Sequence, residues 1–599
     1  MNLSAVRHTG SYPDLYLRDR KTLVFTIHMA AGDTKSCMLV CFPRTDAEKR
    51  KYVPMECRVR DGRLEHFTAE VTFEDTARYQ KYFFRITDRE DKVYFLNAWD
   101  ICETEPKDGF FEFLYANRTN VLEVPQWSKG QVYYQIFPER FCNGDRQNDP
   151  KSCLPWETKP TRENYMGGDL KGILSKMDYL QELGIECIYL NPIFSGDFNH
   201  KYATTDYFRI DPVFGTKKEF AELVEELHKR GIRILLDGVF NHCGVHFPAF
   251  QDLLKNQKES KYADWFYVHS YPVSVSETNA PYECVGDYGY MPKLNTANRE
   301  VQEFIKKVML YWLREFHIDG WRLDVADEVD ATAWMMVRTA VKENFPDALL
   351  LGETWGDGLD MMDGKQMDSM MNYVFRDAVR DFIARESIDA FAFSHRICQM
   401  LSHYPEERNQ VMFLPLDSHD TERFLFHCQG NREKLKLAAV FQMCFVGAPS
   451  VYYGDEIGMT GDNDPDCRRC MVWEPARQDR ELLQHYKKLI QIRKTEGCIK
   501  TGKIAVNVTE GRVFGFIRYD GTEEICVICN AGGDAVSVKV PVFRKAEYEN
   551  LLNGETCMAE PLEDKNICNA DLFDYDGFLD LDLEAFEGKV MKRRKNYED

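Results

Sequence analysis

The sequence lacks an uninterrupted apolar run long enough to cross a membrane. Its most apolar long stretch, residues 437–453, is broken by Gln442, Gly447 and Pro449, whereas a membrane helix needs about 20 mostly apolar residues. The N-terminal segment MNLSAVRHTGSYPDLY has no apolar core of the kind that a secretory signal peptide carries. We therefore expect a cytoplasmic protein with no membrane partner.

Positive charge is scarce. The chain has 76 Lys and Arg against 97 Asp and Glu, a formal net charge of −21. Nucleic acids and anionic membranes are bound mainly through clusters of Lys and Arg. An acidic chain without a basic stripe is a poor candidate for binding nucleic acid, and the excess carboxylates are better explained as a solvated surface.

The cysteines lack the spacing of a structural zinc site. Their number, 19, is odd, which in a chain without a secretory signal favours reduced thiols. Cys467 and Cys470 form one C-x-x-C pair, but no second pair lies at zinc-finger spacing. Cys526 and Cys529 form another in a strand-like run, where a separation of three puts side chains on opposite faces. We expect no metal or redox role for either pair.

Strand-like segments fill both ends of the chain. Residues 1–124 are predicted to form an N-terminal β-sandwich accessory domain, with strands at 23–29, 37–42, 58–71, 82–86 and 92–95 between Gly, Asp and Asn turns. Residues 501–599 are predicted to form a C-terminal antiparallel β-sandwich domain. There the LDLDL run at 579–583 has period two, which favours a half-exposed strand over a calcium site.

Short apolar runs alternate with helical patterns between residues 125 and 500. In 217–230, for example, apolar side chains recur on one helical face before Gly231. Eight such runs predict an α/β fold, a parallel (β/α)8 barrel whose chemistry gathers at the carboxyl ends of the strands. The runs are 132–137, 187–190, 232–240, 320–325, 348–354, 368–374, 411–416 and 450–453.

A long segment with little regular pattern follows the third of these runs. Residues 243–296 separate it from the next helical pattern. Long connections inside compact domains are usually lids or small inserted domains. We expect an inserted loop domain that forms one wall of a cleft.

Four apolar runs end in carboxylate, Arg or His side chains. The segments are DGVFNH (237–242), GWRLD (320–324), GETW (352–355) and SHD (418–420). Asp324, Glu353 and Asp420 are too distant in sequence to form one local charge cluster, and they can meet only if a barrel brings strand ends together. Cleavage of a glycosidic bond requires two carboxylates facing one pocket.

The neighbours of the acids suggest a role for each. Arg322 lies two residues before Asp324 on the same strand, where its positive charge would keep that carboxylate ionised as the nucleophile. Glu353 has apolar neighbours that should raise its pKa and suit it to be the general acid. Asp420 would bind sugar hydroxyls. The alternative, a set of inter-strand salt bridges, is disfavoured because buried charges are costly.

These segments, together with MPKLN (291–295), YYQIFPERF (133–141) and GAPSVYYGDE (447–456), resemble the alpha-amylase superfamily of glycoside hydrolases. MPKLN and VADE (325–328) are similar to its neopullulanase, cyclomaltodextrinase and maltogenic amylase group. The resemblance runs from end to end and assigns the same three roles to the acids. It implies a retaining enzyme that cleaves α-1,4-glucosidic bonds of cyclodextrins, maltooligosaccharides and perhaps pullulan, with transglycosylation when a sugar replaces water.

Further residues are candidates for binding the substrate. His242 and His419 adjoin polar partners in their motifs and are expected to act as neutral donors to sugar hydroxyls. The resemblance implies that His200 and Tyr202 contact the sugar at the cleavage subsite, with Tyr202 as a stacking platform. It implies further that Asp464 and Arg468 clamp the terminal glucosyl unit and that Trp355 borders the acceptor side. The full predicted set is His200, Tyr202, His242, Arg322, Trp355, His419, Asp464 and Arg468.

Oxygen-bearing side chains cluster after the first barrel run. Calcium takes six to eight oxygen ligands, carbonyls included, and the resemblance implies a structural calcium here. The alternative is a loop of Asx turns that binds only water and backbone. The predicted ligands are Asn143, Asp145, Asn148, Asp149, Gly167 through its carbonyl, and Asp169.

Two other functions stay open at this point. One is an α-glucosidase or oligosaccharide transglycosidase of the same superfamily, against which MPKLN and the N-terminal domain argue. The other is an inactive sugar-binding relative, which would require a lost acid, although all three are present. The resemblance also implies a homodimer in which the N-terminal domain packs across the partner's cleft.

Overall fold

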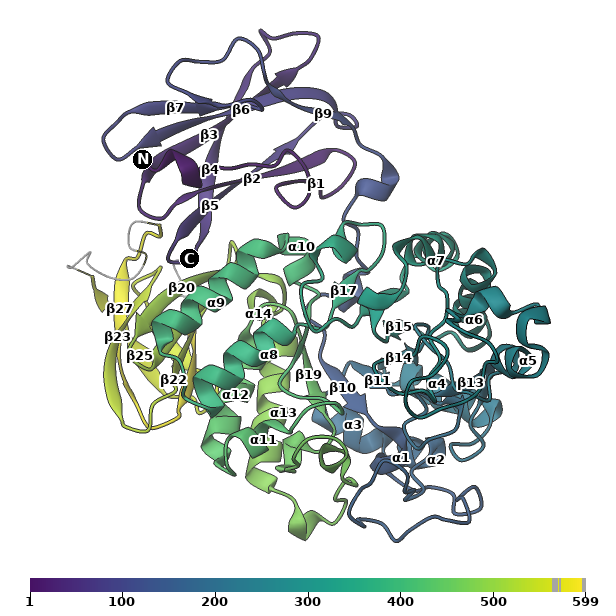
Figure 1. Ribbon diagram of the computed structural model, residues 1–599. Helices are drawn as coiled ribbons and strands as arrows, with labels where there is room; N and C mark the ends of the chain where they lie inside the picture. Colours follow the sequence, from purple (N-terminus) through teal and green to yellow (C-terminus); the bar gives the residue numbers. More distant parts are fainter. Residues whose placement is uncertain (563–568, 570–571, 595–599) are drawn as a thin grey trace.

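The computed structural model describes residues 1–562, 569 and 572–594. The N-terminal sheets, the central barrel and the C-terminal sheets form three bodies, and both sheet domains contact the helices on one side of the barrel (Figure 1). Every helix in the described part of the chain is too short or too polar to span a bilayer.

The N-terminal domain is an antiparallel sandwich. Strand β4 joins its two sheets, because residues 51–55 pair with β3 whereas residues 56–60 pair with β5. The strands are β1 (Leu15–Leu17), β2 (Thr22–Ala30), β3 (Thr34–Pro43), β4 (Lys51–Arg60), β5 (Leu64–Thr72), β6 (Arg78–Asp88), β7 (Val93–Leu96), β8 (Ile101–Cys102) and β9 (Phe111–Tyr115).

One predicted strand of this domain is wrong. The run 58–71 is split into the ends of β4 and β5 by a tight turn. Asp61 Oδ1 accepts hydrogen bonds from the backbone N–H groups of Arg63 (2.9 Å) and Leu64 (2.8 Å), and Gly62 adopts a φ of 84°. An Asp-Gly pair is a common hairpin signal, and here it outweighs the β-rich residues on either side.

The barrel has the predicted parallel arrangement. Its strand order is β17-β16-β15-β14-β11-β10-β19-β18, and a parallel bridge between Met371 and Phe413 brings the two edge strands together. The strands are β10 (Tyr133–Ile136), β11 (Cys187–Leu190), β14 (Arg233–Gly238), β15 (Gly320–Leu323), β16 (Leu349–Gly352), β17 (Ser369–Met370), β18 (Phe413–Pro415) and β19 (Ala448–Tyr452).

Helices surround the barrel and begin at side-chain caps. Thr216 and Glu219 form a capping box at the start of α4, and the Asn298 side chain caps α6. The longer helices are α3 (Met177–Leu183), α4 (Lys217–Lys229), α6 (Arg299–Phe316), α7 (Ala331–Asn344), α8 (Tyr373–Val379), α9 (Ala390–His403), α12 (Arg432–Cys444) and α13 (Arg480–Thr495). Shorter helices are α1 (Pro138–Phe141), α2 (Leu170–Leu174), α10 (Glu406–Asn409), α11 (Phe424–His427) and α14 (Gly497–Thr501).

Alternation along the strands separates two apolar layers. On β16, Leu350 belongs to the layer between strands and helices, whereas Leu349 and Leu351 belong to the cluster inside the barrel. Because side chains of a strand alternate between faces, the next inward position after Leu351 is residue 353. The same alternation directs residues 322 and 324 inward after β15.

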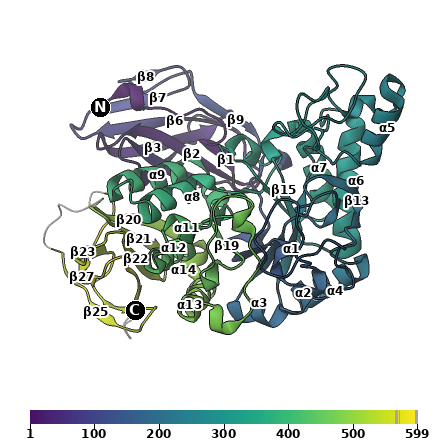
Figure 2. The same ribbon diagram turned by 60° about the horizontal axis from the view of Figure 1, so that its bottom comes forward.

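The segment 243–296 forms a small excursion beside the barrel. It holds the helix α5 (Pro248–Asn256) and is tied down by antiparallel bridges such as His242–Lys293 and Phe266–Leu294. In both ribbon views α5 lies on the side of the barrel remote from the C-terminal sheets (Figures 1 and 2). A hairpin of β12 (Phe194–Gly196) and β13 (Thr204–Ile210) follows β11.

The C-terminal domain has two antiparallel sheets in the described residues. Cys526 and Cys529 of β22 belong to different apolar clusters, and Asp580 and Asp582 are exposed on a strand whose alternate residues are buried. The strands are β20 (Lys503–Glu510), β21 (Val513–Tyr519), β22 (Glu524–Asn530), β23 (Val536–Val542), β24 (Glu547–Asn550), β25 (Thr556–Met558), β26 (Glu560–Pro561), β27 (Gly577–Leu583) and β28 (Gly588–Arg593).

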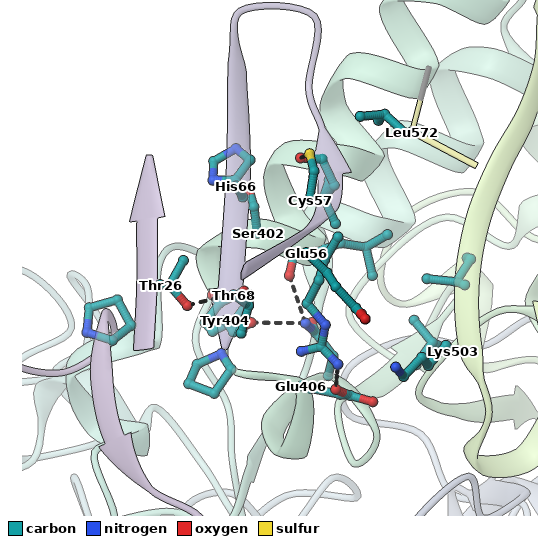
Figure 3. A pocket seen from close by; sticks show the side chains of 18 of the residues that line it. Thr26, Glu56, Cys57, His66, Thr68, Ser402, Tyr404, Glu406, Lys503 and Leu572 are labelled. Atoms are coloured by element: carbon teal, nitrogen blue, oxygen red, sulfur yellow. Dashed lines mark hydrogen bonds and ion pairs between the residues drawn. The ribbon is translucent and has the colours of Figure 1, made fainter. Parts of the chain in front are cut away.

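The three bodies meet around a shared cavity. Figure 3 shows this space, of about 390 Å³, with Thr26 from the N-terminal domain, Tyr404 from the barrel and Lys503 from the C-terminal domain in its lining. An ion pair between Arg58 and Glu406 joins two of the bodies there.

Candidate active site

Polar side chains converge inside the barrel at the carboxyl ends of β14, β15 and β16. The parallel register sets Asp237 beside Arg322 and Arg322 beside Leu351. Asp324 and Glu353 follow the last residues of β15 and β16, and both are buried. The structure therefore brings together the acids that the sequence separates by 29 positions.

Arg322 lies at the centre of three carboxylates. Its Nη1 is 2.9 Å from Oδ1 of Asp237 and 2.9 Å from Oδ1 of Asp324, and its Nη2 is 2.7 Å from Oε1 of Glu353. Arg322 therefore contacts Asp324, as expected, and also two carboxylates for which the sequence suggested no contact with it. The inward side chains of three adjacent strands end at the same level, so one guanidinium reaches all of them.

The environment raises the pKa of both proposed reacting carboxyls. Burial is the largest cause for Asp324 and for Glu353, and the Arg322 guanidinium opposes it in each case. Three buried carboxylates around one cation retain a proton more readily than separated groups do. The raised pKa of Asp324 is opposite in direction to the effect expected from Arg322, because burial outweighs the guanidinium.

Asp237 received no role from the sequence, yet it anchors the floor of the site. It accepts hydrogen bonds from Tyr189 Oη (2.6 Å), Tyr202 Oη (2.9 Å) and Arg322 Nη1 (2.9 Å). Burial raises its pKa to about 6, against the lowering effect of Arg322. Its inward position on β14 was the available signal, since Leu235 two residues earlier faces the barrel interior.

A directional chain of hydrogen bonds runs through His419. Gln135 Nε2 donates to His419 Nδ1 at 2.8 Å, which leaves the proton on Nε2. That nitrogen is 2.6 Å from Tyr202 Oη, which in turn donates to Asp237. Burial, with Arg468 next, lowers the pKa of His419 well below its usual value. The imidazole is therefore neutral and fixed in one tautomer.

His242 is also buried and neutral. Burial lowers its pKa to about 4, and the ammonium of Lys293 acts in the same direction. Its polar neighbour is the Tyr202 backbone, and among the described residues neither ring nitrogen makes a hydrogen bond of good geometry. A buried imidazole in this state has a donor and an acceptor to offer to a ligand.

Near-parallel rings lead from the β12–β13 hairpin into the site. The ring centroids of His200 and Tyr202 are 5.8 Å apart, and those of Tyr202 and His419 are 5.4 Å apart. Phe198 stacks on His200 at 5.3 Å. Tyr202 is thus fixed by ring contacts and by its hydroxyl, and a sugar-stacking role for it stays a prediction.

Asp420 is the most open of the three predicted catalytic acids. Its side chain is 30% exposed, with Oδ1 3.1 Å from Arg468 Nη2 and Oδ2 3.0 Å from His419 Nε2. Arg468 also pairs with Asp464, at 2.9 Å between Nη1 and Oδ1. The predicted clamp residues Asp464 and Arg468 are therefore joined to the predicted catalytic acid Asp420.

Trp355 projects from the opening just after Glu353. Its side chain is 54% exposed, and it stacks on Tyr373 with centroids 4.2 Å apart and planes 7° from parallel. Arg376 lies 5.7 Å from the Trp355 ring. Sequence reasoning missed Tyr373, because nothing in its neighbourhood distinguishes it from a core aromatic residue.

Two family models match most of the chain. Residues 135–502 match the family model "Alpha amylase, catalytic domain", and residues 1–117 match "Alpha amylase, N-terminal ig-like domain". The chain belongs to the alpha-amylase family of glycoside hydrolases. The match to the catalytic-domain model, residues 135–502, includes Asp237, Asp324, Glu353 and Asp420.

Relatives within the alpha-amylase family align over nearly the whole chain. A cyclomaltodextrinase of Thermoanaerobacter pseudethanolicus is 42% identical over 538 residues, 89% of this chain and 93% of the relative. Neopullulanase 2 of Thermoactinomyces vulgaris is 39% identical over 565 residues, 93% and 96% of the two chains. A solved cyclomaltodextrinase structure superposes with a TM-score of 0.91 and 36% identity, covering 99% and 100% of the chains.

In this family member the predicted calcium ligands split into two groups. The buried amide oxygens Oδ1 of Asn143 and Asn148 lack hydrogen-bond partners among the described residues. A Cβ added to Gly167 would lie 2.2 Å from Oδ1 of Asp149 and 2.3 Å from Nδ2 of Asn143, so this glycine packs directly on both side chains. Orphaned oxygens beside a carboxylate fit a hard cation.

All three carboxylates of the set have protein partners, and Asp149 Oδ1 accepts a hydrogen bond from Asn143 Nδ2 at 2.8 Å. Asp145 Oδ2 forms an ion pair with Lys171 Nζ at 2.5 Å. Asp169 caps α2 and accepts hydrogen bonds from the backbone N–H groups of Gly144 (3.1 Å), Asp145 (2.8 Å) and Gly172 (2.6 Å). Across the described residues there is no cluster of three or more His, Cys, Asp and Glu able to hold a metal by themselves, so amide and carbonyl oxygens carry the calcium prediction.

Proposed function

We propose that this protein hydrolyses α-1,4-glucosidic bonds of cyclodextrins and short maltooligosaccharides with retention of configuration. The observation that carries the proposal is the buried trio of Asp237, Asp324 and Glu353 around Arg322, at the carboxyl ends of adjacent barrel strands. Two carboxyl groups facing one sugar are what retaining glycosidases use. The names of the relatives, cyclomaltodextrinase and neopullulanase 2, support this choice of substrates.

The first step forms a covalent intermediate. Glu353 gives its proton to the glycosidic oxygen as the bond from that oxygen to the anomeric carbon breaks. A carboxylate oxygen of Asp324 bonds to the same carbon, which yields a glycosyl ester and a free leaving sugar. Asp420 accepts hydrogen bonds from hydroxyls of the glucosyl unit. His242 and His419, as neutral imidazoles, donate hydrogen bonds to hydroxyls of the same unit.

The second step restores the enzyme. Glu353, now ionised, takes a proton from water as the water oxygen bonds to the anomeric carbon and the ester bond to Asp324 breaks. When a sugar hydroxyl replaces water, the product is a transglycosylated oligosaccharide. Arg322 stays charged throughout, and it offsets the negative charge that moves between Asp324 and Glu353.

An α-glucosidase or transglycosidase of the same family is the alternative. The match of residues 1–117 to an N-terminal domain model and the names of the relatives favour cyclodextrin hydrolysis over this alternative. We also propose pullulan as a further substrate, because one relative is named neopullulanase 2.

Incubation with β-cyclodextrin tests the proposal. We expect ring opening followed by release of maltose, seen by thin-layer chromatography, and an initial product of α configuration by proton NMR. The variant Asp324→Asn serves as the matched control and should release no maltose. Glucose release from maltose with intact β-cyclodextrin would favour the α-glucosidase, and an initial β product would exclude a retaining mechanism.

We further propose one structural calcium ion, held by Asn143, Asn148, Asp149 and the Gly167 carbonyl. The support is the pair of orphaned amide oxygens and the contact of Gly167 with Asn143 and Asp149. A bound ion would supply charge neutralisation and cross-link the loop after β10. It takes no part in the reaction.

We also propose a cytoplasmic homodimer. Buried thiols such as Cys187, Cys243 and Cys526 suit a reducing compartment. Exposed aromatic side chains on the N-terminal domain, such as Trp99 (75%) and Tyr52 (55%), suit an interface. Light scattering at micromolar concentration should give the mass of two chains, and a monomer at all concentrations would exclude the dimer.

A further inference from the structure

Three segments that are distant in sequence meet beyond the Asp420–Arg468 pair. Asp464, after β19, has its Oδ1 2.9 Å from Arg468 Nη1. Its Oδ2 accepts a hydrogen bond at 3.2 Å from Nε of Arg162, in the loop after β10. Arg162 also interacts with the Tyr288 hydroxyl of the inserted segment. Charges therefore alternate from Asp420 through Arg468 and Asp464 to Arg162.

The turn that carries Arg162 is locked in place by its own polar groups. Thr161 Oγ1 accepts hydrogen bonds from the backbone N–H groups of Glu163 (3.3 Å) and Asn164 (3.1 Å). Asn164 Oδ1 accepts one in return from the Thr161 N–H at 2.9 Å. Such reciprocal bonds fix a turn without help from a sheet or helix.

Two buried side chains support the same turn from below. Asn199, which is 2% exposed, donates from Nδ2 to the carbonyls of Thr161 (3.2 Å) and Asn164 (2.7 Å). Arg140, which is 1% exposed, donates from Nη2 to the Asn164 carbonyl (3.0 Å) and to its Oδ1 (2.9 Å). Since Asn199 directly precedes His200, the turn is tied to the loop that enters the proposed site.

Exposure of the side chains rises from Arg468 to Arg162, although Asp420 at the other end of the series is itself 30% exposed. The side chains of Arg468, Asp464 and Arg162 are 9%, 18% and 50% exposed. Arg162 is therefore the most exposed of the four side chains. An exposed side chain on a rigid turn keeps its position when a sugar chain binds, because the turn is already ordered. It can therefore limit how far the sugar chain extends.

We propose that Arg162 is a specificity-determining residue that limits the number of glucosyl units held on the non-reducing side of the cleaved bond. This inference rests on the proposed function. The leaving sugar departs on the side of Glu353 and Trp355, so the retained glucosyl chain extends toward Asp420, Arg468 and Asp464. There Arg162 contacts Asp464 and Tyr288, and it joins three segments of the chain beyond Asp420.

The strength of the ion pair between Arg162 and Asp464 sets the expected change in the ratio of cleavage products. A half-exposed ion pair contributes up to about 1 kcal/mol, which corresponds to roughly fivefold in a ratio of rates. Removing Arg162 should open the end of the cleft and raise cleavage that leaves longer non-reducing fragments by up to about fivefold. The chemical step itself should change little, because Arg162 touches none of the reacting groups.

Cleavage of maltoheptaose with a fluorescent tag on its reducing end tests this inference. Chromatography of the first-cut products shows which bond is broken. We expect Arg162→Ala to shift cleavage toward longer untagged fragments. We expect Arg162→Lys to shift it less, because an ammonium keeps the charge, and Tyr288→Phe to shift it slightly in the same direction.

A neighbouring arginine provides the matched control. Arg469 pairs with Asp466 at 2.6 Å and lies outside the series of charges from Asp420 to Arg162, so Arg469→Ala should keep the wild-type pattern. An unchanged pattern in Arg162→Ala and Tyr288→Phe, with unfolding temperatures close to wild type, would overturn the inference. If Arg162→Ala fails to fold, Arg162→Lys and Tyr288→Phe decide. A wild-type protein that leaves maltoheptaose intact would instead refute the proposed function.

Discussion

Arg322 and Glu353 form a fully buried ion pair, with 2.7 Å between Nη2 and Oε1. The same guanidinium holds Asp324 and Asp237 through Nη1. A single cation thus fixes the relative positions of the two carboxyls that we propose to react. Because the planar guanidinium offers several donors in a rigid fork, its replacement tests whether that positioning matters.

Arg322→Lys should reduce kcat/KM on β-cyclodextrin by about 10²-fold or more, because one ammonium cannot contact three carboxylates in fixed directions. It should also lower the free energy of unfolding by roughly 2–4 kcal/mol, since a carboxylate loses its buried partner. Steady-state kinetics and urea titration measure both effects. Arg233→Lys, on the partly exposed opposite end of β14, is the control and should change either quantity little. Equal behaviour of the two variants would contradict the central role of Arg322.

The pH dependence of activity should report the raised pKa of Glu353. The acid must be protonated to act, so activity is present below its pKa and is lost as pH rises through it. Burial raises that pKa, and the alkaline limb of kcat/KM should therefore lie at a higher pH than the ordinary pKa of glutamate. Glu353→Gln should remove this limb with α-maltosyl fluoride, whose leaving group needs no proton. Persistence of the limb in that variant would assign it to another group.

Calcium should stabilise the protein if the loop after β10 binds it. At a free concentration about 100 times the dissociation constant, the gain is roughly 2.7 kcal/mol. Differential scanning calorimetry should show a higher unfolding temperature with calcium than with a chelator, and Asp149→Ala should abolish the difference. Glu182→Ala, at an exposed position of α3, should keep it. An identical unfolding temperature with calcium and with chelator in the wild type would contradict the site.

Acid should destabilise the N-terminal domain through His8. Burial lowers the pKa of His8 to about 4, while the unfolded chain has the ordinary value near 6.5. The unfolded state therefore takes up the proton first, and stability present above about pH 6.5 is lost as pH falls toward 4, by on the order of 3 kcal/mol. His8→Gln should weaken this dependence in urea titrations at pH 7 and pH 5. His269→Gln, at a half-exposed site, should retain the pH dependence of the wild type. An equal change in the free energy of unfolding between pH 7 and pH 5 for His8→Gln and wild type would refute this account.

Much of the fold follows from periodicity in the sequence. The helical pattern at 217–230 coincides with α4 (Lys217–Lys229) to within one residue, and each of the eight predicted apolar runs overlaps a barrel strand. The hairpin at Asp61–Gly62 was missed because β-rich residues flank a turn only three residues long. A turn can interrupt a strand-like pattern where an Asp side chain accepts hydrogen bonds from the backbone N–H groups that follow it.

The site was only partly predictable. Strand ends pointed to Asp324 and Glu353, because parallel strands finish at one edge of a barrel. The positions of Asp237 and Tyr373 depend on contacts across strands that no local pattern records. The same holds for Arg162, whose partners Asp464 and Tyr288 lie more than a hundred residues away in sequence. The role of a side chain that acts through long-range contacts can be recognised only once the fold is known.

The most direct test of the central claim is to trap the covalent intermediate. Glu353→Gln incubated with α-maltosyl fluoride should form the ester and release it slowly, since the general base for the second step is missing. Peptide mass spectrometry should then find one maltosyl group on Asp324. A maltosyl group on Asp237 or Asp420, or fluoride release without any labelled peptide together with a β-configured product, would contradict the account.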